Sequence, residues 1–329
     1  MRNAVIRSSG AYVPSRVLPN SYFDESLGED VSTWLCGNLH IKERRWCAED
    51  ESTIDLCLHA ANQALDRAGL EAKDLDLIIV ATDTPEYLTP STASVLQYRL
   101  QAGHAGTFDL NAACAGFITG LDVAAKYIMT DDRYNHVMVV GAYAISKYLD
   151  KSNKKTVTLF ADGAGAIILG SEENGKAGYL GSELITLGQY YDGMGIYGGG
   201  TKHPTTAESI QKGEDKLRIN YRFPPELNPQ VWTTMARNLG QRFDFNPTEV
   251  DHYILTQINI NSIRQTLDNL KVPHDRAHTS MEYYAYTGSA CIPITFNSAM
   301  EKGKIKKDDL VMMIGSGSGL SFGSVAFRF

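Results

Sequence analysis

Residues 111–117, Asn-Ala-Ala-Cys-Ala-Gly-Phe, contain the side chain best suited to covalent chemistry, Cys114. A β-type run at 107–110 stops at small residues and a helical pattern begins at Ala115, which predicts a strand-to-helix turn at Cys114. Unpaired N–H groups and the dipole at a helix N-terminus favour the thiolate, which is the nucleophilic form of cysteine. The pattern therefore favours a catalytic nucleophile, although a cysteine among small apolar residues, taken alone, is more often part of a core.

The other four cysteines lack this context, and we interpret Cys36, Cys47, Cys57 and Cys291 as structural. The total of five is odd, and no pair has the Cys-x-x-Cys spacing of zinc or redox sites. This usage fits a reducing cytoplasm better than a disulfide framework, so we expect a cytoplasmic protein without a metal site.

Composition excludes several classes of partner. The 329 residues include 31 basic and 38 acidic side chains, for a net charge of −7, which disfavours non-specific binding to nucleic acid or to an anionic membrane. We find no apolar run long enough to cross a bilayer, and the N-terminal residues have the pattern of a strand entering a turn rather than of a signal peptide. We therefore expect neither a nucleic-acid nor a membrane partner.

Elements that would position Cys114 alternate between helix and strand. Ser52 can cap a helix that Gly69 ends, and the apolar run at 75–81 is typical of a strand buried on both faces. The expected elements of the first half are helix 52–70, strand 75–81, strand 107–112, helix 115–129, strand 136–141 and strand 164–169.

The second half of the chain repeats this theme. Residues 74–82 are echoed by 249–256, and residues 135–141 are echoed by 309–315. The latter two segments each lead to a glycine-rich turn and a closing strand. Any α/β protein can show such echoes, but together they favour an internally duplicated α/β fold with halves at 1–170 and 171–329.

The motif at 111–117 resembles the nucleophile motif of the β-ketoacyl-ACP synthase III family. The likeness extends over essentially the whole chain, through matches at 10–14, at Trp34 with 41–44, at 160–166, at 198–204 and at 323–329. The resemblance implies a five-layered, thiolase-type αβαβα fold, a homodimer, and an acyl group carried on Cys114 as a thioester.

Two positions depart from the family pattern, in which a histidine and an asparagine complete the site. The histidine position holds Thr256 and the asparagine position holds Tyr286. That pair stabilises the enolate formed when a malonyl thioester loses CO₂, and hydroxyl groups cannot replace an imidazole base near pH 7. Acyl loading needs mainly a thiolate and an oxyanion hole, which the resemblance assigns to the backbone N–H groups of Cys114 and Ser318.

Three other residues could serve as a base. His252 and His278 lie within a few residues of the altered positions, although each is more simply a surface or core histidine. Glu86 lies in the loop that, in the family, reaches the partner's acyl pocket, and a solvated loop charge is its simpler interpretation.

The resemblance also places contacts to a thioester carrier. Trp34 occupies the position that stacks on the CoA adenine, and Asn259 the position that binds the pantetheine arm. Arginines are usual where this chain has Asn38, Asn261 and Lys154. Loss of guanidinium groups weakens bidentate phosphate binding, so donor recognition is expected to differ. No permanently bound cofactor is expected, and the substrate would be an acyl-CoA or an acyl-ACP with its phosphopantetheine.

Three functions remain open. The first is an acyltransferase of specialised metabolism that passes the acyl group from Cys114 to an amine, an alcohol or a preformed carbanion. The second is a decarboxylative β-ketoacyl-ACP synthase with an unusual Cys-Thr-Tyr site. The third is a non-catalytic subunit that forms a heterodimer with an active paralogue, against which retention of a complete cysteine motif argues.

Overall fold

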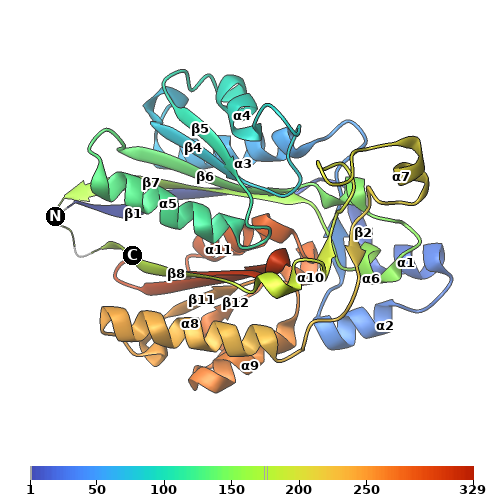
Figure 1. The fold of residues 1–329 in the computed structure, drawn as a ribbon. Helices are drawn as coiled ribbons and strands as arrows, with labels where there is room; N and C mark the ends of the chain where they lie inside the picture. Colours follow the sequence, from blue (N-terminus) through green and yellow to red (C-terminus); the bar gives the residue numbers. More distant parts are fainter. Residues whose placement is uncertain (1, 174, 176) are drawn as a thin grey trace.

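The computed structural model describes residues 2–173, 175 and 177–329, and its secondary structure forms five stacked layers (Figure 1). Two mixed sheets enclose a central layer of helices, and further helices cover the outer face of each sheet. This arrangement confirms the layered α/β architecture expected for the chain.

The first sheet has the strand order β1-β7-β6-β4-β5. Its strands are β1 (Arg2–Tyr12), β4 (Leu77–Ala81), β5 (Gly106–Leu110), β6 (His136–Tyr143) and β7 (Gly163–Glu173). β4 runs parallel to both β5 and β6, whereas β7 is antiparallel to β6 and β1. The carboxyl ends of β5, β4 and β6 therefore meet at one edge of the sheet.

The second sheet has the order β12-β11-β13-β14-β8. Its strands are β8 (Gly178–Thr186), β11 (His252–Leu255), β12 (Ala277–His278), β13 (Leu310–Gly317) and β14 (Ser321–Arg328). β13 is parallel to β11 and antiparallel to β14, as β6 is parallel to β4 and antiparallel to β7. The echoed segments thus occupy equivalent strands, and the two halves are similar. The division near residue 170 as a domain boundary stays a prediction.

The central layer contains α5 (Gly116–Thr130) and α11 (Cys291–Glu301). α5 packs against strands of both sheets, and its own apolar side chains, such as Phe117, Leu121 and Ile128, are fully buried. A helix that is apolar on most faces must be enclosed, which is why this segment lies between the two sheets.

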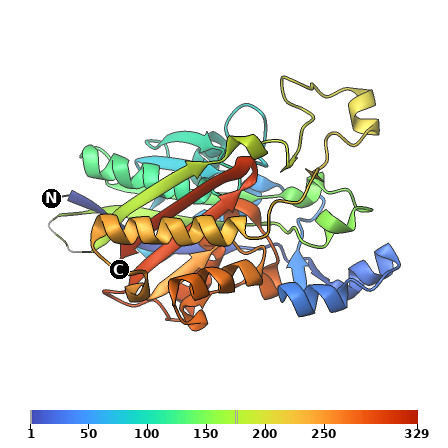
Figure 2. The same cartoon turned by 60° about the horizontal axis from the view of Figure 1, so that its bottom comes forward.

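The outer layers consist of α3 (Thr53–Ala68) and α4 (Thr92–Leu100) on the first sheet, and of α8 (Leu227–Phe243) and α9 (Ile260–Leu270) on the second (Figures 1 and 2). The predicted helix at 52–70 is α3, which begins with a capping box between Ser52 and Asp55 and ends at Gly69, whose φ is 64°. Shorter elements are β2 (Val17–Pro19), α1 (Asn20–Leu27), α2 (Ser32–Trp34), β3 (Glu43–Arg45), α6 (Lys154–Val157), β9 (Met194–Gly195), α7 (Ala207–Gln211), β10 (Arg218–Ile219) and α10 (Met281–Tyr284).

The ring of His278 contacts His252, which lies at the opposite end of β11 from Thr256. His252 begins β11, about 13 Å of extended chain from Thr256. Its Nε2 is 2.9 Å from a carboxylate oxygen of Asp309, and its Nδ1 is 3.0 Å from Nε2 of His278. The suggestion that either histidine serves as a base beside residue 256 is therefore wrong, because both are engaged in this structural chain.

Burial, and then the neighbouring His252, lowers the pKa of His278 to about 4. Between the unfolded value near 6.5 and this folded value, the unfolded chain binds a proton that the folded chain does not, so the stability from this group is present above pH 6.5 and is lost as the pH falls toward 4. We expect this histidine to account for about 2 kcal/mol of destabilisation between pH 7 and pH 5. Urea unfolding of His278→Gln at both pH values should show a smaller pH dependence than wild type. The exposed His203→Gln should behave like wild type, and an unchanged pH dependence in His278→Gln would contradict the assignment.

Candidate active site

Three side chains converge where the parallel strands of the first sheet end. Cys114 follows β5, Asp83 follows β4, and Tyr143 is the last residue of β6. All three line one pocket of about 300 Å³. The other lining residues are Asn111, Ala112, Ala113, Ile145, Met194, Gly195, Ile196, Leu217, Ser318, Gly319 and Ser321. Carboxyl ends of parallel strands are a common position for binding sites in α/β folds, so this pocket is the candidate active site.

Cys114 lies in a tight turn between β5 and α5. Ala113 has a φ of 47°, an unusual backbone conformation for a residue with a side chain. The N–H of Gly116 donates to the carbonyl of Ala113 at 2.9 Å, which starts the helix. Gly317 packs so closely that a Cβ there would be 2.5 Å from the Cys114 nitrogen. The predicted strand-to-helix turn is confirmed, and contacts with β13 hold its strained backbone.

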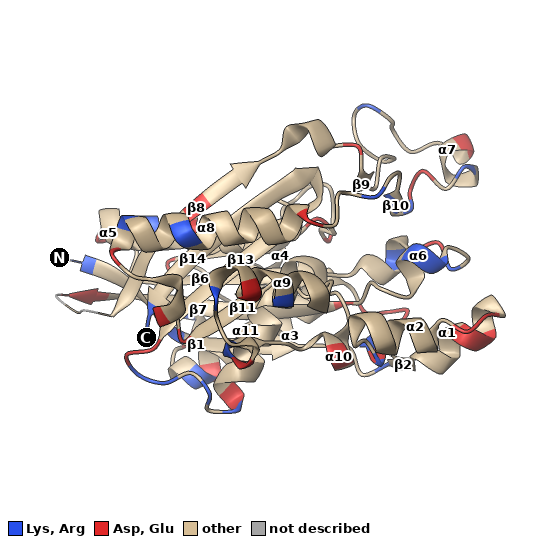
Figure 3. Cartoon of the chain, turned by 90° about the horizontal axis from the view of Figure 1, so that it is seen from below, with Lys and Arg blue, Asp and Glu red and all other residues tan. Residues whose placement is uncertain are grey.

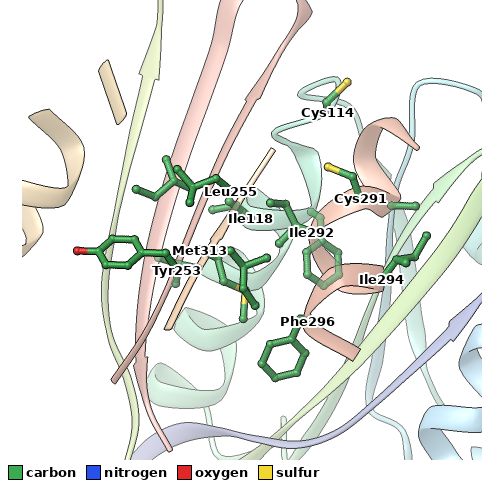
Figure 4. Packing of buried hydrophobic residues seen from close by; sticks show 14 of the residues in the cluster. Cys114, Ile118, Tyr253, Leu255, Cys291, Ile292, Ile294, Phe296 and Met313 are labelled. Atoms are coloured by element: carbon green, nitrogen blue, oxygen red, sulfur yellow. The ribbon is translucent and has the colours of Figure 1, made fainter. Parts of the chain in front are cut away.

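The sulfur of Cys114 lies at the edge of the buried apolar cluster and points away from Ile292 and Phe296 (Figure 4). Only 2% of the residue is exposed. Burial and the nearby Asp83 carboxylate raise the pKa of Cys114 well above its usual value, although a hydrogen bond from Tyr286 opposes them. The expectation that the helix N-terminus keeps this sulfur ionised is therefore wrong: desolvation is the larger effect, and the resting group is a thiol.

Tyr286 is a buried neighbour of Cys114, and its hydroxyl group lowers the pKa of the Cys114 thiol in opposition to burial. Its N–H donates to the carbonyl of Leu159 at 3.0 Å, and its own carbonyl accepts from the N–H of Ala161 at 2.9 Å. The ring also packs against Phe160, with ring centres 5.4 Å apart. Backbone pairing and aromatic contact thus fix a hydroxyl donor beside the sulfur.

Replacing Tyr286 by phenylalanine should slow alkylation of Cys114. The hydroxyl stabilises the thiolate, so its removal raises the pKa of the thiol further and should reduce the labelling rate at pH 8 by about tenfold. Mass spectrometry of iodoacetamide-treated protein measures the rate at this residue. Tyr284→Phe, two residues away on the chain, is the matched control and should label like wild type. Equal rates for Tyr286→Phe and wild type would refute the hydrogen bond.

Of Ser318 and Thr256, only Ser318 lines the pocket. Ser318 lines the pocket, and its hydroxyl donates to the carbonyl of Met194. Thr256 is buried and does not line the pocket, because its hydroxyl accepts a hydrogen bond from the N–H of Ser316 at 2.8 Å. The structure thus brings together Cys114, Tyr286 and Ser318, and connects Thr256 to them only through β13.

Cys114 and Ser318 both line the pocket, so their backbone N–H groups lie at its wall. The oxyanion-hole role that the resemblance assigns to these two N–H groups stays a prediction.

A second pocket, of about 520 Å³, contains two of the predicted carrier-binding residues, Trp34 and Lys154. The Trp34 residue is 52% exposed, which leaves its ring free to stack on a ligand. Lys154 forms an ion pair with Glu29 at 2.7 Å, and Figure 3 shows the basic α6 close to the acidic end of α1. Lys155 and Arg222 also line this pocket and add positive charge.

The three asparagines at the predicted carrier-binding positions form hydrogen bonds with one another and with the backbone near Trp34. The amide of Asn261 donates to the carbonyl of Asn38 at 3.0 Å, and the amide of Asn38 donates to the carbonyl of Trp34 at 3.2 Å. Asn259 caps α9 by accepting from the N–H of Asn261 at 3.0 Å. They lie beside the Trp34 segment without lining its pocket, so any contact with a carrier remains a prediction.

Glu86 is not at the site. One carboxylate oxygen accepts from the hydroxyl of Ser52 and the other from the N–H of Ile54, each at 3.0 Å. The residue therefore holds the start of α3, and its suggested role as a base is wrong. The acidic residue that does reach the pocket is Asp83, three positions earlier. A carboxylate two residues after a fully apolar strand was the signal for it, and the sequence analysis did not use that signal.

Comparison with known proteins identifies the family. The profile described as 3-oxoacyl-[acyl-carrier-protein (ACP)] synthase III matches residues 108–188, and the profile of its C-terminal part matches residues 241–329. The β-ketoacyl-[acyl-carrier-protein] synthase III of Geobacillus kaustophilus is 38% identical over 322 residues, which cover 97% of each chain. This chain belongs to the 3-oxoacyl-[acyl-carrier-protein] synthase III family.

Solved structures of the synthase III family agree with this assignment. The enzyme from Aquifex aeolicus superposes with a TM-score of 0.88 at 31% identity, covering 99% of this chain and all of the other. The enzyme from Thermus thermophilus gives a TM-score of 0.90 at 28% identity, with 99% of both chains covered. The thiolase-type αβαβα fold expected from the resemblance is thereby confirmed.

Two further observations concern sites outside the pocket. Among the helices that the structure describes, none is long and apolar enough to cross a membrane. The described residues also contain no group of three or more His, Cys, Asp or Glu side chains arranged to hold a metal ion.

Proposed function

We propose that this synthase III relative is an acyltransferase that carries its acyl group on Cys114. The supporting observation is that Cys114, at the start of α5, lines a pocket together with Ser318, while Tyr286 lies next to Cys114 behind the pocket lining. The sulfur would attack the carbonyl carbon of an acyl-CoA or acyl-ACP. The N–H groups of Cys114 and Ser318 would stabilise the negative oxygen that forms, and the carrier thiol would leave.

The acceptor in this proposal already carries a nucleophilic atom, such as an amine, an alcohol or a preformed carbanion. The reason is that the histidine position of the family holds Thr256, whose hydroxyl is engaged with Ser316, and the asparagine position holds Tyr286. A site with few hydrogen-bond donors is suited to acyl loading, because the thioester that is consumed and the thioester that forms on Cys114 have similar free energies. Such a reaction would place the protein in specialised metabolism.

A decarboxylative synthase is the second candidate, favoured by the names of the relatives and by the position of the Tyr286 hydroxyl. A third, the non-catalytic partner of a paralogue, has less support, since a scaffold needs neither a pocket around Cys114 nor a donor aimed at its sulfur.

The carrier and the assembly state also belong to the proposal. The Trp34 pocket has an exposed indole and basic side chains, which suit the nucleotide of CoA or the phosphopantetheine of a carrier protein. β5 is an edge strand whose residues are only partly buried, and the loop before α4 exposes Tyr87 and Leu88. An open sheet edge beside exposed apolar side chains favours pairing with a second copy, so we infer a homodimer.

The test is acylation of the wild-type protein. Incubation with acetyl-CoA, octanoyl-CoA and the corresponding acyl-ACPs should add one acyl mass, which peptide mapping should locate at Cys114. Sedimentation of the same sample should give a dimer. Failure to gain that mass with every donor would refute the proposed function.

A further inference from the structure

Asp83 is held in a fixed position between the ends of two neighbouring strands. The preceding residue, Thr82, donates its N–H to the carbonyl of Leu110 at 3.1 Å, next to the turn that carries Cys114. The following residue, Thr84, accepts at its hydroxyl from the N–H of Ala144 at 2.9 Å. Both threonines are buried, so the backbone on each side of Asp83 is fixed and its side chain remains at the pocket.

The Asp83 carboxyl group lacks the partners that other buried carboxylates in this region have. Asp109 accepts from the N–H groups of Thr92 and Ala93 at 2.6 and 2.7 Å. Oδ1 of Asp83 is buried and finds no hydrogen-bond donor among the described residues. An unpaired buried oxygen costs stability, so a purely structural role does not explain this carboxyl group.

The groups facing Asp83 are thiol and phenol rather than cations. Cys114 and Tyr143 line the same pocket and lie close enough for their charges to be coupled to that of Asp83. No Lys, Arg or His is among the residues that line the pocket in the described part of the chain. Among the lining residues a carboxylate here has no ion-pair partner, and the Cys114 thiol, which is ordinarily more acidic than a phenol, is a proton donor that shares the pocket with it.

We propose that Asp83 is the acid–base residue of the Cys114 site. The inference rests on the proposed acyl-transfer function and assigns the proton transfers that it needs. During loading, the Asp83 carboxylate takes the proton of the Cys114 thiol while sulfur bonds to the acyl carbon. When the carbon–sulfur bond to the carrier breaks, Asp83 returns the proton to the carrier sulfur.

In the second half of the reaction, transfer of the acyl group to the acceptor, Asp83 again first takes up a proton and then returns it. An amine or alcohol attacks the acyl-Cys114 carbonyl and gives its proton to the Asp83 carboxylate. The bond from carbon to Cys114 sulfur then breaks, and the proton passes from Asp83 to that sulfur. Each cycle restores the thiol and the carboxylate, so no further reactant is required.

The acidity of Asp83 suits this role. Burial raises the pKa of Asp83 to about 6, so a carboxylate that still binds a proton well predominates near neutral pH. A general base works best when its pKa is close to the working pH, and an ordinary surface aspartate is too weak a base for this purpose.

The experiment compares single-turnover acylation of wild type, Asp83→Asn and Asp83→Glu between pH 5 and pH 8. The donor is whichever of acetyl-CoA and octanoyl-CoA loads the wild type faster, and the readout is the acyl mass at Cys114. Wild type should accelerate as the pH rises through about 6 and then level off, because the carboxylate is the active form. Asp83→Asn should be slower by about 10²-fold and lose this rise, and Asp83→Glu should retain a rise with a shifted midpoint.

Controls separate the outcomes. The exposed Asp150→Asn should match wild type, and thermal unfolding of each variant checks that it is folded. Asp83→Ala replaces Asp83→Asn if the amide variant does not fold. Equal rates and pH profiles for wild type and the folded Asp83 variant would overturn the acid–base role while leaving acyl transfer intact. A wild type that never gains acyl mass would overturn the acyl-transfer function itself, and the role of Asp83 with it.

Discussion

Replacing Cys114 by alanine should abolish acyl loading altogether. The acyl–sulfur bond can form at no other atom of the pocket, because Cys114 is the one sulfur-bearing nucleophile among its described lining residues. Intact-protein mass spectrometry after incubation with the best donor should therefore show one added acyl group on wild type and none on Cys114→Ala. Product formation should fall to the rate without enzyme.

Cys291 provides the matched control for this variant. It is also a buried free thiol, it begins α11, and Figure 4 shows it near Cys114 within the same cluster. It does not line the pocket, so Cys291→Ala should keep the acyl adduct even if the small cavity lowers stability. An acyl adduct that persists in Cys114→Ala, or disappears in Cys291→Ala while that variant is folded, would contradict the assignment of the nucleophile.

Decarboxylation of a malonyl thioester should be slower than in a family member with the usual histidine and asparagine, by about 10²–10³-fold. The enolate formed on loss of CO₂ needs donors aimed at its oxygen. Here neither Tyr286 nor Thr256 lines the pocket, and the Thr256 hydroxyl accepts from the N–H of Ser316. Release of radioactive CO₂ from labelled malonyl-ACP measures the rate directly.

The reference for that assay is a synthase III whose own sequence contains the histidine and the asparagine. The two proteins should be compared at equal concentration with the same malonyl-ACP. Release at a similar rate from both would favour the decarboxylative synthase over transfer to an existing nucleophile. Slow release together with efficient loading of Cys114 would favour the proposed acyltransferase.

The resting state of the site follows from competition between two effects on one sulfur. The N-terminus of α5 and the Tyr286 hydroxyl favour the thiolate, whereas burial and the Asp83 charge favour the thiol. Burial is the larger effect, so in the proposed reaction the Cys114 thiol would lose its proton while it attacks the acyl group rather than before. This is the physical reason why a base at the pocket matters more here than at an exposed cysteine.

The sequence alone determined the alternation of strands and helices, the duplicated halves and the position of the candidate nucleophile. These properties depend on local patterns: the apolar run of β4, the capping residues of α3, and the small residues around Cys114 each predict structure over a few positions. The resemblance likewise extended along the whole chain, and the family assignment confirmed it.

Only the tertiary structure decided which side chains share the pocket and which protonation state they adopt. Asp83 and Cys114 are 31 positions apart in the sequence, and the parallel pairing of β4 with β5 is what brings them to one edge. Glu86, only three residues from Asp83, is turned toward α3, and Thr256 is bonded to Ser316. The pKa of Cys114 depends on how completely the two halves exclude water around it, and such desolvation is a property of the packed molecule rather than of any segment.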